Sequence, residues 1–266
     1  MVELRPYAAL FRGHVRSMTS YRASFVVELG TNVAGAALDV LAVLVLFRVT
    51  RTVAGFRMSE ALLMVSLSSF AFSWADFTVG NIDQIKKYVR TGTLDAVLIR
   101  PLSAFGQLVL MDLPLRKASR VMVSFTVLVV ALRTADIEWT PARVALLLIT
   151  PPAGVVFFGS IFVLSASLAF WWVESGELGN AFTYGGRDFT AYPMAAYSGW
   201  FRDVFAYGLG FGFVAYHPAL GLLGRADPLG LPSWAAWLAP LVALIAAGVA
   251  AVVWRTGIRH YRSTGS

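Results

Sequence analysis

Residues 234–254 read WAAWLAPLVALIAAGVAAVVW, 21 consecutive positions without a charged side chain. An α-helix rises about 1.5 Å per residue, so a stretch of this length crosses the roughly 30 Å hydrocarbon core of a bilayer. Tryptophans stand near both ends, where their amphipathic rings suit the membrane–water interface. The stretch predicts a membrane-spanning helix, and it places the chain in the all-α integral membrane class.

The composition of the whole chain agrees with this fold class. Hydrophobic residues make up 58% of the 266 residues and charged residues 14%, whereas a soluble domain has about 25% charged residues. A soluble globule and a disordered chain are both excluded, because so little polar surface cannot cover so much apolar side chain. The formal charge of +7 indicates loops that face an anionic membrane surface, and we expect no nucleic-acid partner.

Residues for catalysis or metal binding are scarce. The chain has no cysteine, which excludes disulfides, thiolate metal sites and a cysteine nucleophile. Its three histidines, His14, His217 and His260, are too scattered for a metal cluster, and no His-Glu-x-x-His motif occurs. We therefore expect no catalytic residue and no metal site.

Five further apolar runs precede the opening stretch, which gives six predicted membrane helices. The runs are 23–47, 61–79, 121–132 with a start near Ala118, 144–173, and 204–223. The fourth run contains Pro151-Pro152, which predicts a kink or a late helix start. The fifth is rich in glycine, so it is either one full span or a re-entrant pair of short helices.

The distribution of Lys and Arg predicts the orientation. With both termini in the cytoplasm, the inside segments 1–22, 80–120, 174–203 and 255–266 hold 16 of the 22 basic residues. Because basic residues accumulate on the cytoplasmic side, we expect a multi-pass protein of the cell inner (plasma) membrane with both termini inside.

We expect no cleavable signal peptide in the first 22 residues, because they lack a continuous apolar core. Leu4, Tyr7, Phe11 and Val15 recur at helical spacing and are flanked by arginines. This pattern predicts an amphipathic helix over 1–22 that lies at the cytoplasmic interface, and a frayed basic leader is the alternative.

Polar residues interrupt the first apolar run on one helical face. Glu28 and Asp39 are eleven residues apart, so they point in nearly the same direction from the helix axis, and Asn32 and Gly35 lie between them on that face. A charge in the bilayer is costly, so this stripe must face protein or a cavity. It either lines a route across the membrane or packs helices together at an interface between two chains. Asp76, near the cytoplasmic end of the second helix, is expected to lie at the membrane–water interface.

The segment 81–103 reads NIDQIKKYVRTGTLDAVLIRPLS and is the main cytoplasmic loop. It is too polar to cross a bilayer, and it predicts a short amphipathic helix capped by Gly92 and a second one from Leu94 to Ile99. Leu94 and Leu98 are four residues apart, so we expect them on one face. The loop either docks on a partner protein or stiffens the interface by lying on lipid headgroups.

Three stretches of the chain resemble one family. The residues Gly92-Thr93-Leu94-Asp95, Leu98 and Arg100-Pro101-Leu102 are similar to the cytosolic loop of type-2 ATP-binding-cassette exporter permeases. Residues 257–266 are similar to the C-terminal signature of a six-helix subgroup of this family. The fifth-helix region of the same subgroup is similar to Tyr192-Pro193, Tyr197, Trp200, Arg202, Phe213, Tyr216 and Pro218-Ala219. One departure is Gly-Phe-Gly at 210–212, where the subgroup leads us to expect a proline.

This resemblance implies one permease domain over 1–266, the transmembrane subunit of an exporter. Two permease chains, identical or related, would pair with two copies of a separate ATPase, which would bind the ATP and Mg²⁺. No Gly-x-x-x-x-Gly-Lys-Ser/Thr loop occurs, so we expect no ATPase activity and no cofactor in this chain.

Within the loop, the resemblance implies a coupling helix that contacts the ATPase. Its candidate residues are Ile82, Ile85, Lys86, Val89, Leu94, Asp95 and Leu98. The alternative function is a secondary transporter or channel that uses Glu28 and Asp39. Such a protein should show an inverted repeat, and none is visible.

Overall fold

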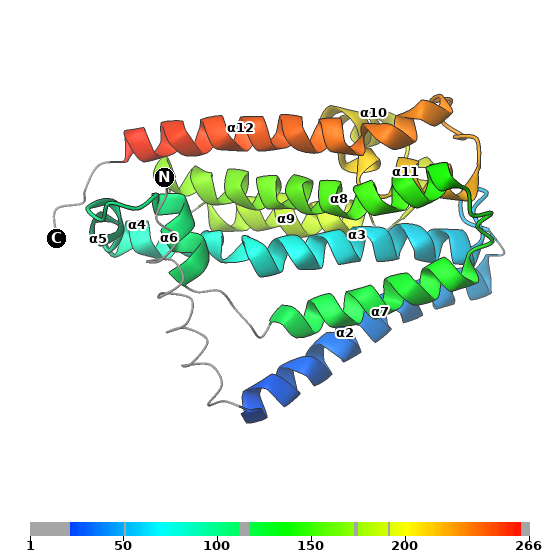
Figure 1. The fold of residues 1–266 in the computed structure, drawn as a ribbon, viewed down its shortest axis with the longest axis horizontal. Coiled ribbons are helices and arrows are strands. Elements are labelled where there is room, and N and C mark those ends of the chain that lie inside the picture. Colours follow the sequence, from blue (N-terminus) through cyan, green and yellow to red (C-terminus); the bar gives the residue numbers. More distant parts are fainter. Residues whose placement is uncertain (1–21, 51, 112–116, 173–174, 191, 262–266) are drawn as a thin grey trace.

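The computed structural model describes residues 22–50, 52–111, 117–172, 175–190 and 192–261, and every regular element within them is helical (Figure 1). The expected all-α class is therefore confirmed. The interfacial helix predicted over 1–22 lies outside these residues except for Arg22, the first residue of α2.

Long helices form a bundle whose axes run in nearly the same direction (Figure 1). These are α2 (Arg22–Val49), α3 (Met58–Thr78), α7 (Ala118–Thr134), α8 (Pro141–Ser167) and α12 (Ala239–His260). They cover five of the six predicted apolar runs. Among the described residues, Met58–Thr78, Pro141–Phe170 and Ser233–His260 are long and apolar enough to cross a membrane.

Shorter elements cap the two ends of the bundle. One end carries η1 (Gly80–Gln84), α4 (Ile85–Arg90), α5 (Leu94–Leu98), α6 (Ala104–Met111), η3 (Leu168–Phe170) and the last turn of α12. The opposite end carries the α2–α3 and α7–α8 connections, α11 (Tyr216–Leu223) and η7 (Ser233–Leu238).

The start of α8 excludes the late start, one of the two alternatives expected from Pro151-Pro152. Thr140 caps the helix by accepting a hydrogen bond from the Arg143 amide at 3.3 Å, and Pro141 occupies the first turn, where its missing N–H costs nothing. The helix then runs without a break through Pro151 and Pro152. Most of its apolar window is buried inside the protein, where neighbouring helices support the irregular backbone.

The predicted run 204–223 is not one continuous helix. The chain passes through α10 (Gly199–Arg202), a π-helical turn η5 (Asp203–Gly208), a 3₁₀ turn η6 (Phe211–Phe213) and then α11. Gly210 lies at the break with φ +86°, and a Cβ atom there would lie 2.5 Å from Val242. At the point where the family resemblance led us to expect a proline, a glycine turn redirects the chain.

Helix α9 (Gly176–Thr190) was not predicted, because 174–203 was expected to be a cytoplasmic connection. It instead packs along α8 and α3. The Thr183 and Ser165 hydroxyls are hydrogen-bonded at 3.0 Å, and Thr190 is hydrogen-bonded to Ser68 in the middle of α3. α9 thus enters the bundle from the α4–α5 end and stops about halfway along α3.

Candidate functional site

The loop predicted to couple to a partner is tightly packed against its own chain. Ile82 and Ile85 have no exposed surface, and Val89 is only 5% exposed. Gly92, at φ +69°, follows the last turn of α4 as expected for a helix C-terminus. The apolar face predicted for the first short helix therefore exists, but it belongs to the interior of this chain.

Leu94 and Leu98, which were predicted to share one face of the second short helix and to contact a partner, differ in burial. Leu94 is 1% exposed, whereas Leu98 is 37% exposed and its neighbour Ile99 is 83% exposed. α5 is only five residues long, so its inner side fills the core and its last turn projects outward. Among the loop's large apolar residues, Leu98 and Ile99 are those most available to a partner.

Gln107 of α6 holds the loop in place, a role that sequence patterns did not indicate. Its side chain is fully buried, and its Nε2 donates to the carbonyls of Val97 at 3.0 Å and Leu102 at 3.1 Å. The first bond satisfies a carbonyl at the end of α5, where a helix leaves its last carbonyls unpaired, and the second holds the segment that follows α5. The amide thus fixes the position from which Leu98 and Ile99 project.

The end of α12 also reaches this loop. Tyr261 lies beside Asp95, and its pKa is raised by burial first and by the Asp95 carboxylate second. Phe170 and Tyr261 make an edge-on ring contact, as do Phe105 of α6 and Trp254. Two stretches that carry the family resemblance, the loop and the chain end, therefore meet in one cluster.

Asp76 lies two residues before the end of α3 and is buried within the protein, while its expected place at the membrane interface stays a prediction. It is 1% exposed, and its carboxylate accepts from Lys117 Nζ at 2.6 Å and Arg120 at 3.0 Å. A Cβ atom on Gly80 would lie 2.2 Å from the Asp76 carboxylate, so glycine is needed at the start of η1. This cluster ties α3 to the start of α7 directly behind the loop.

A basic groove of about 290 Å³ lies beside these ion pairs. It is lined by Asp83, Gln84, Lys86, Lys87, Arg90, Gly176 and Glu177. The pKa of Asp83 is raised to about 6, mainly because burial disfavours its charge, and Lys86 and Lys117 offset part of this effect. The predicted coupling residue Lys86 thus belongs to α4, and its side chain reaches the start of α9.

Replacing Asp83 by asparagine should remove a pH dependence of stability. The pKa of Asp83 is about 6 in the folded chain against an ordinary 3.8, so the folded state binds the proton more tightly than the unfolded state. The contribution of Asp83 to wild-type stability therefore falls as the pH rises from about 4 to about 6 and is constant above that range. We expect Asp83→Asn to raise the melting temperature near pH 7.5 and to lose this advantage near pH 4.

Thermal unfolding of the purified chain across this pH range measures the effect. Asp136→Asn removes an exposed carboxylate, 94% accessible, and serves as the control for a change in net charge. A constant difference between wild type and Asp83→Asn at every pH would contradict the assignment.

The predicted intramembrane stripe is only partly described. Asn32 lies on α2 and donates from Nδ2 to the Ser119 hydroxyl of α7 at 2.7 Å. Glu28 and Asp39 lie on the same helix, but their side chains are outside the described part of the structure. Asn32 therefore joins two helices of this one chain, a contact that neither expected role included.

A cavity of about 260 Å³ opens beside Asn32, between α2, α3, α7 and α9. Its polar lining comes from Thr31, Asn32, Ser69, Ser73, Ser124, Arg120 and Arg187. The Arg187 guanidinium lies 5.8 Å from the centre of the Phe72 ring, a cation–π arrangement. Asn32 and Gly35 of the stripe thus border a polar cavity within the bundle.

Comparison with known proteins identifies the family. The family model described as "ABC-2 family transporter protein" matches residues 33–265, nearly the whole chain. No curated protein and no solved structure matches significantly. The matched segment includes the loop, the broken helix and the end of α12, the regions that carried the resemblance in the sequence. The chain therefore belongs to the ABC-2 transporter family and is an ABC-2 type permease.

Proposed function

We propose that this chain is the transmembrane subunit of an ATP-driven exporter and that a separate ATPase supplies the energy. In this arrangement, α4 and α5 transmit the movement of the ATPase to the bundle. Two permease chains pair with two ATPase subunits, and the ATPases hold ATP and Mg²⁺.

One observation carries the docking role of the loop. Leu98 and Ile99 are exposed at the end of a loop whose other apolar residues are largely buried. The same loop carries exposed basic residues, Lys87, Arg90 and Arg100. An apolar centre with a charged rim is the usual composition of a protein–protein interface.

The exposed face of α9 supports a substrate route or a second permease chain at this position. Asp188, near the last residue of α9, is 75% exposed. It lies at the depth in the bundle where Thr190 contacts Ser68. Asn180 is exposed two turns earlier. Lipid does not accept such groups at membrane depth, so this face requires water or protein against it.

The distribution of basic residues favours the same membrane orientation when the segment that contains α9 is left out of the count. Without Arg187 and Arg202, the predicted inside segments still hold 14 basic residues, and the opposite end holds six. We therefore infer that α4, α5 and the end of α12 are cytoplasmic.

Cysteine labelling tests this topology, because the chain has no cysteine of its own. Thr91→Cys, at the exposed turn after α4, should resist a membrane-impermeant thiol reagent in intact cells. Asp136→Cys, at the opposite end and 94% exposed in the wild type, should react, and both should react after lysis. Labelling of Thr91→Cys, but not of Asp136→Cys, in intact cells would show the opposite orientation.

Purification from the native membrane tests the function itself. The tagged chain should retain an ATPase subunit with a phosphate-binding loop, and the complex should hydrolyse ATP faster than that subunit alone. Recovery of the full chain without any ATPase subunit would contradict the proposal.

A further inference from the structure

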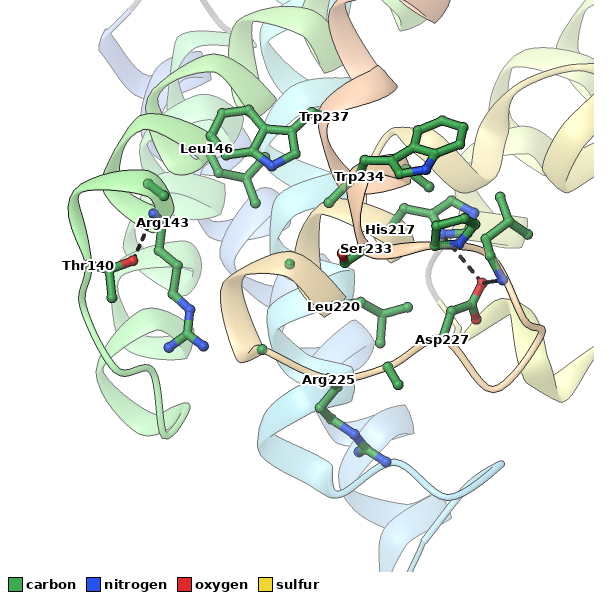
Figure 2. Close-up of a pocket in the computed structure, with 18 residues that line it drawn as sticks. Thr140, Arg143, Leu146, His217, Leu220, Arg225, Asp227, Ser233, Trp234 and Trp237 are labelled. Carbon is green, nitrogen blue, oxygen red and sulfur yellow. Dashed lines mark hydrogen bonds and ion pairs between the residues drawn. The ribbon is translucent and has the colours of Figure 1, made fainter.

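A second, larger cavity of about 590 Å³ lies at the end of the bundle opposite the loop (Figure 2). It is formed by the start of α8, the end of α11 and η7. Its volume falls within the usual range for small-molecule sites. Figure 2 shows Trp234 and Trp237 on one side of the cavity and Arg143 and Arg225 on the other.

Both arginines in the lining are already neutralised by this chain. Arg143 donates to the Glu138 carbonyl at 2.6 Å and lies 3.7 Å from its carboxylate. Arg225 donates to Glu60 at 2.5 Å and to the Gly55 carbonyl at 3.1 Å. The cavity therefore offers guanidinium N–H groups without a demand for an additional negative charge.

The single carboxylate in the lining is also satisfied. Asp227 accepts from the Tyr216 hydroxyl at 2.9 Å and from the amides of Leu229 at 3.0 Å and Leu231 at 3.3 Å. A cationic ligand would compete with these three donors. Because the charges in the cavity are balanced, the lining favours a ligand that is polar but uncharged.

His217 supplies the unfilled hydrogen-bonding position. The residue is 2% exposed and its Nδ1 lies 3.8 Å from Asp227, while its Nε2 has no hydrogen-bond partner within the described residues. A buried polar atom without a partner is costly and rare. His217 lines the cavity, but its Nε2 is buried, so a ligand hydroxyl becomes the missing partner when the imidazole turns toward the cavity.

The aromatic side of the cavity narrows the ligand class further. Trp234 and Trp237 present indole rings whose faces carry partial negative charge and attract weakly positive C–H groups. Thr140 and Ser233 add hydroxyl groups to the lining. We propose that this cavity binds a neutral sugar headgroup, with the ring against the tryptophans and a hydroxyl at His217 Nε2.

This inference goes beyond the proposed function and does not depend on the ATPase. It can be tested with the full chain in the membrane complex in which it is isolated, purified in a detergent that has no sugar headgroup. The complex is placed in phosphatidylcholine nanodiscs that contain a small fraction of diglucosyldiacylglycerol or of phosphatidylglycerol. Native mass spectrometry then measures which lipid the protein retains.

Two variants of the cavity are compared with a matched control. Trp234→Leu with Trp237→Leu removes two rings that are 60% and 43% exposed, and His217→Gln removes the imidazole. Trp171→Leu with Trp172→Leu removes rings that are 47% and 54% exposed at the opposite end. Loss of two aromatic contacts should weaken binding about tenfold.

The proposal expects the wild type and the control to retain the glycolipid over phosphatidylglycerol and both cavity variants to lose it. Competition by methyl glucoside would show that the headgroup alone suffices. Its failure to compete, with the same loss in the variants, would assign the site to membrane-bound glycolipid. Equal retention of phosphatidylglycerol, no selective retention by the wild type, or undiminished binding in the Trp234/Trp237 variant would overturn the proposal.

Discussion

Replacing both Leu98 and Ile99 by aspartate is expected to release the ATPase while the chain itself stays folded. Ile99 is 83% exposed and Leu98 37%, so neither substitution places a charge in the core. Burial of a Leu or Ile side chain in a partner contributes about 1.5–3 kcal/mol. Losing both contacts should weaken ATPase binding by about a hundredfold or more, and transport should stop.

Co-purification of the ATPase and its stimulated hydrolysis measure this effect. Val49→Asp is a suitable control, because Val49 is also 83% exposed but lies at the opposite end of the bundle. Retention of the ATPase by the double variant would leave the loop as a stiffener at the lipid headgroups. Leu94→Asp cannot replace this test, because Leu94 is buried and its substitution should unfold the loop.

Replacing Asp76 by asparagine is expected to destabilise the bundle itself. The variant leaves Lys117 and Arg120 without the carboxylate that both of them contact. Removing one partner of a buried ion pair costs about 3–5 kcal/mol. Because the two cations are 27% and 44% exposed, water compensates them in part, and we expect a loss near 3 kcal/mol.

Denaturant unfolding of the purified chain measures this loss. Asp136→Asn provides the comparison, because its pair with Arg57 spans 4.0 Å between exposed side chains and should contribute less than about 1 kcal/mol. Adding Lys117→Gln to Asp76→Asn should recover part of the stability. Equal stability of the Asp76 and Asp136 variants would show that the Asp76 cluster does not hold α3 to α7.

Long apolar runs predicted the helices well because their signal is local. The run 61–79 corresponds to α3 and the run 144–173 to α8 with η3, each within a few residues. α9 was missed because Glu177, Asn180, Arg187 and Asp188 interrupt its hydrophobicity. A weaker signal was present, since Gly179, Thr183 and Gly186 are buried at three- and four-residue spacing, a pattern of small residues typical of close helix packing.

The candidate site depended more strongly on contacts between distant residues. Asp76 and its partners Lys117 and Arg120 are 41 and 44 residues apart, and no sequence period connects them. The Gln107 amide reaches the end of α5, and Tyr261 reaches Asp95 from the far end of the chain. Only the packed bundle brings these groups together.

The sequence alone determined the class of the molecule, its main apolar helices and the segment most suited to meet a partner. Hydropathy and charge are sums over neighbouring residues, so they can be read without a fold. Tertiary structure alone decided that Leu94 is buried while Leu98 and Ile99 are exposed, and that the helix breaks at Gly210 between η5 and η6. The physical reason is that burial is set by the elements that pack on a residue, and a helical period gives the faces of a helix without saying which of them is covered.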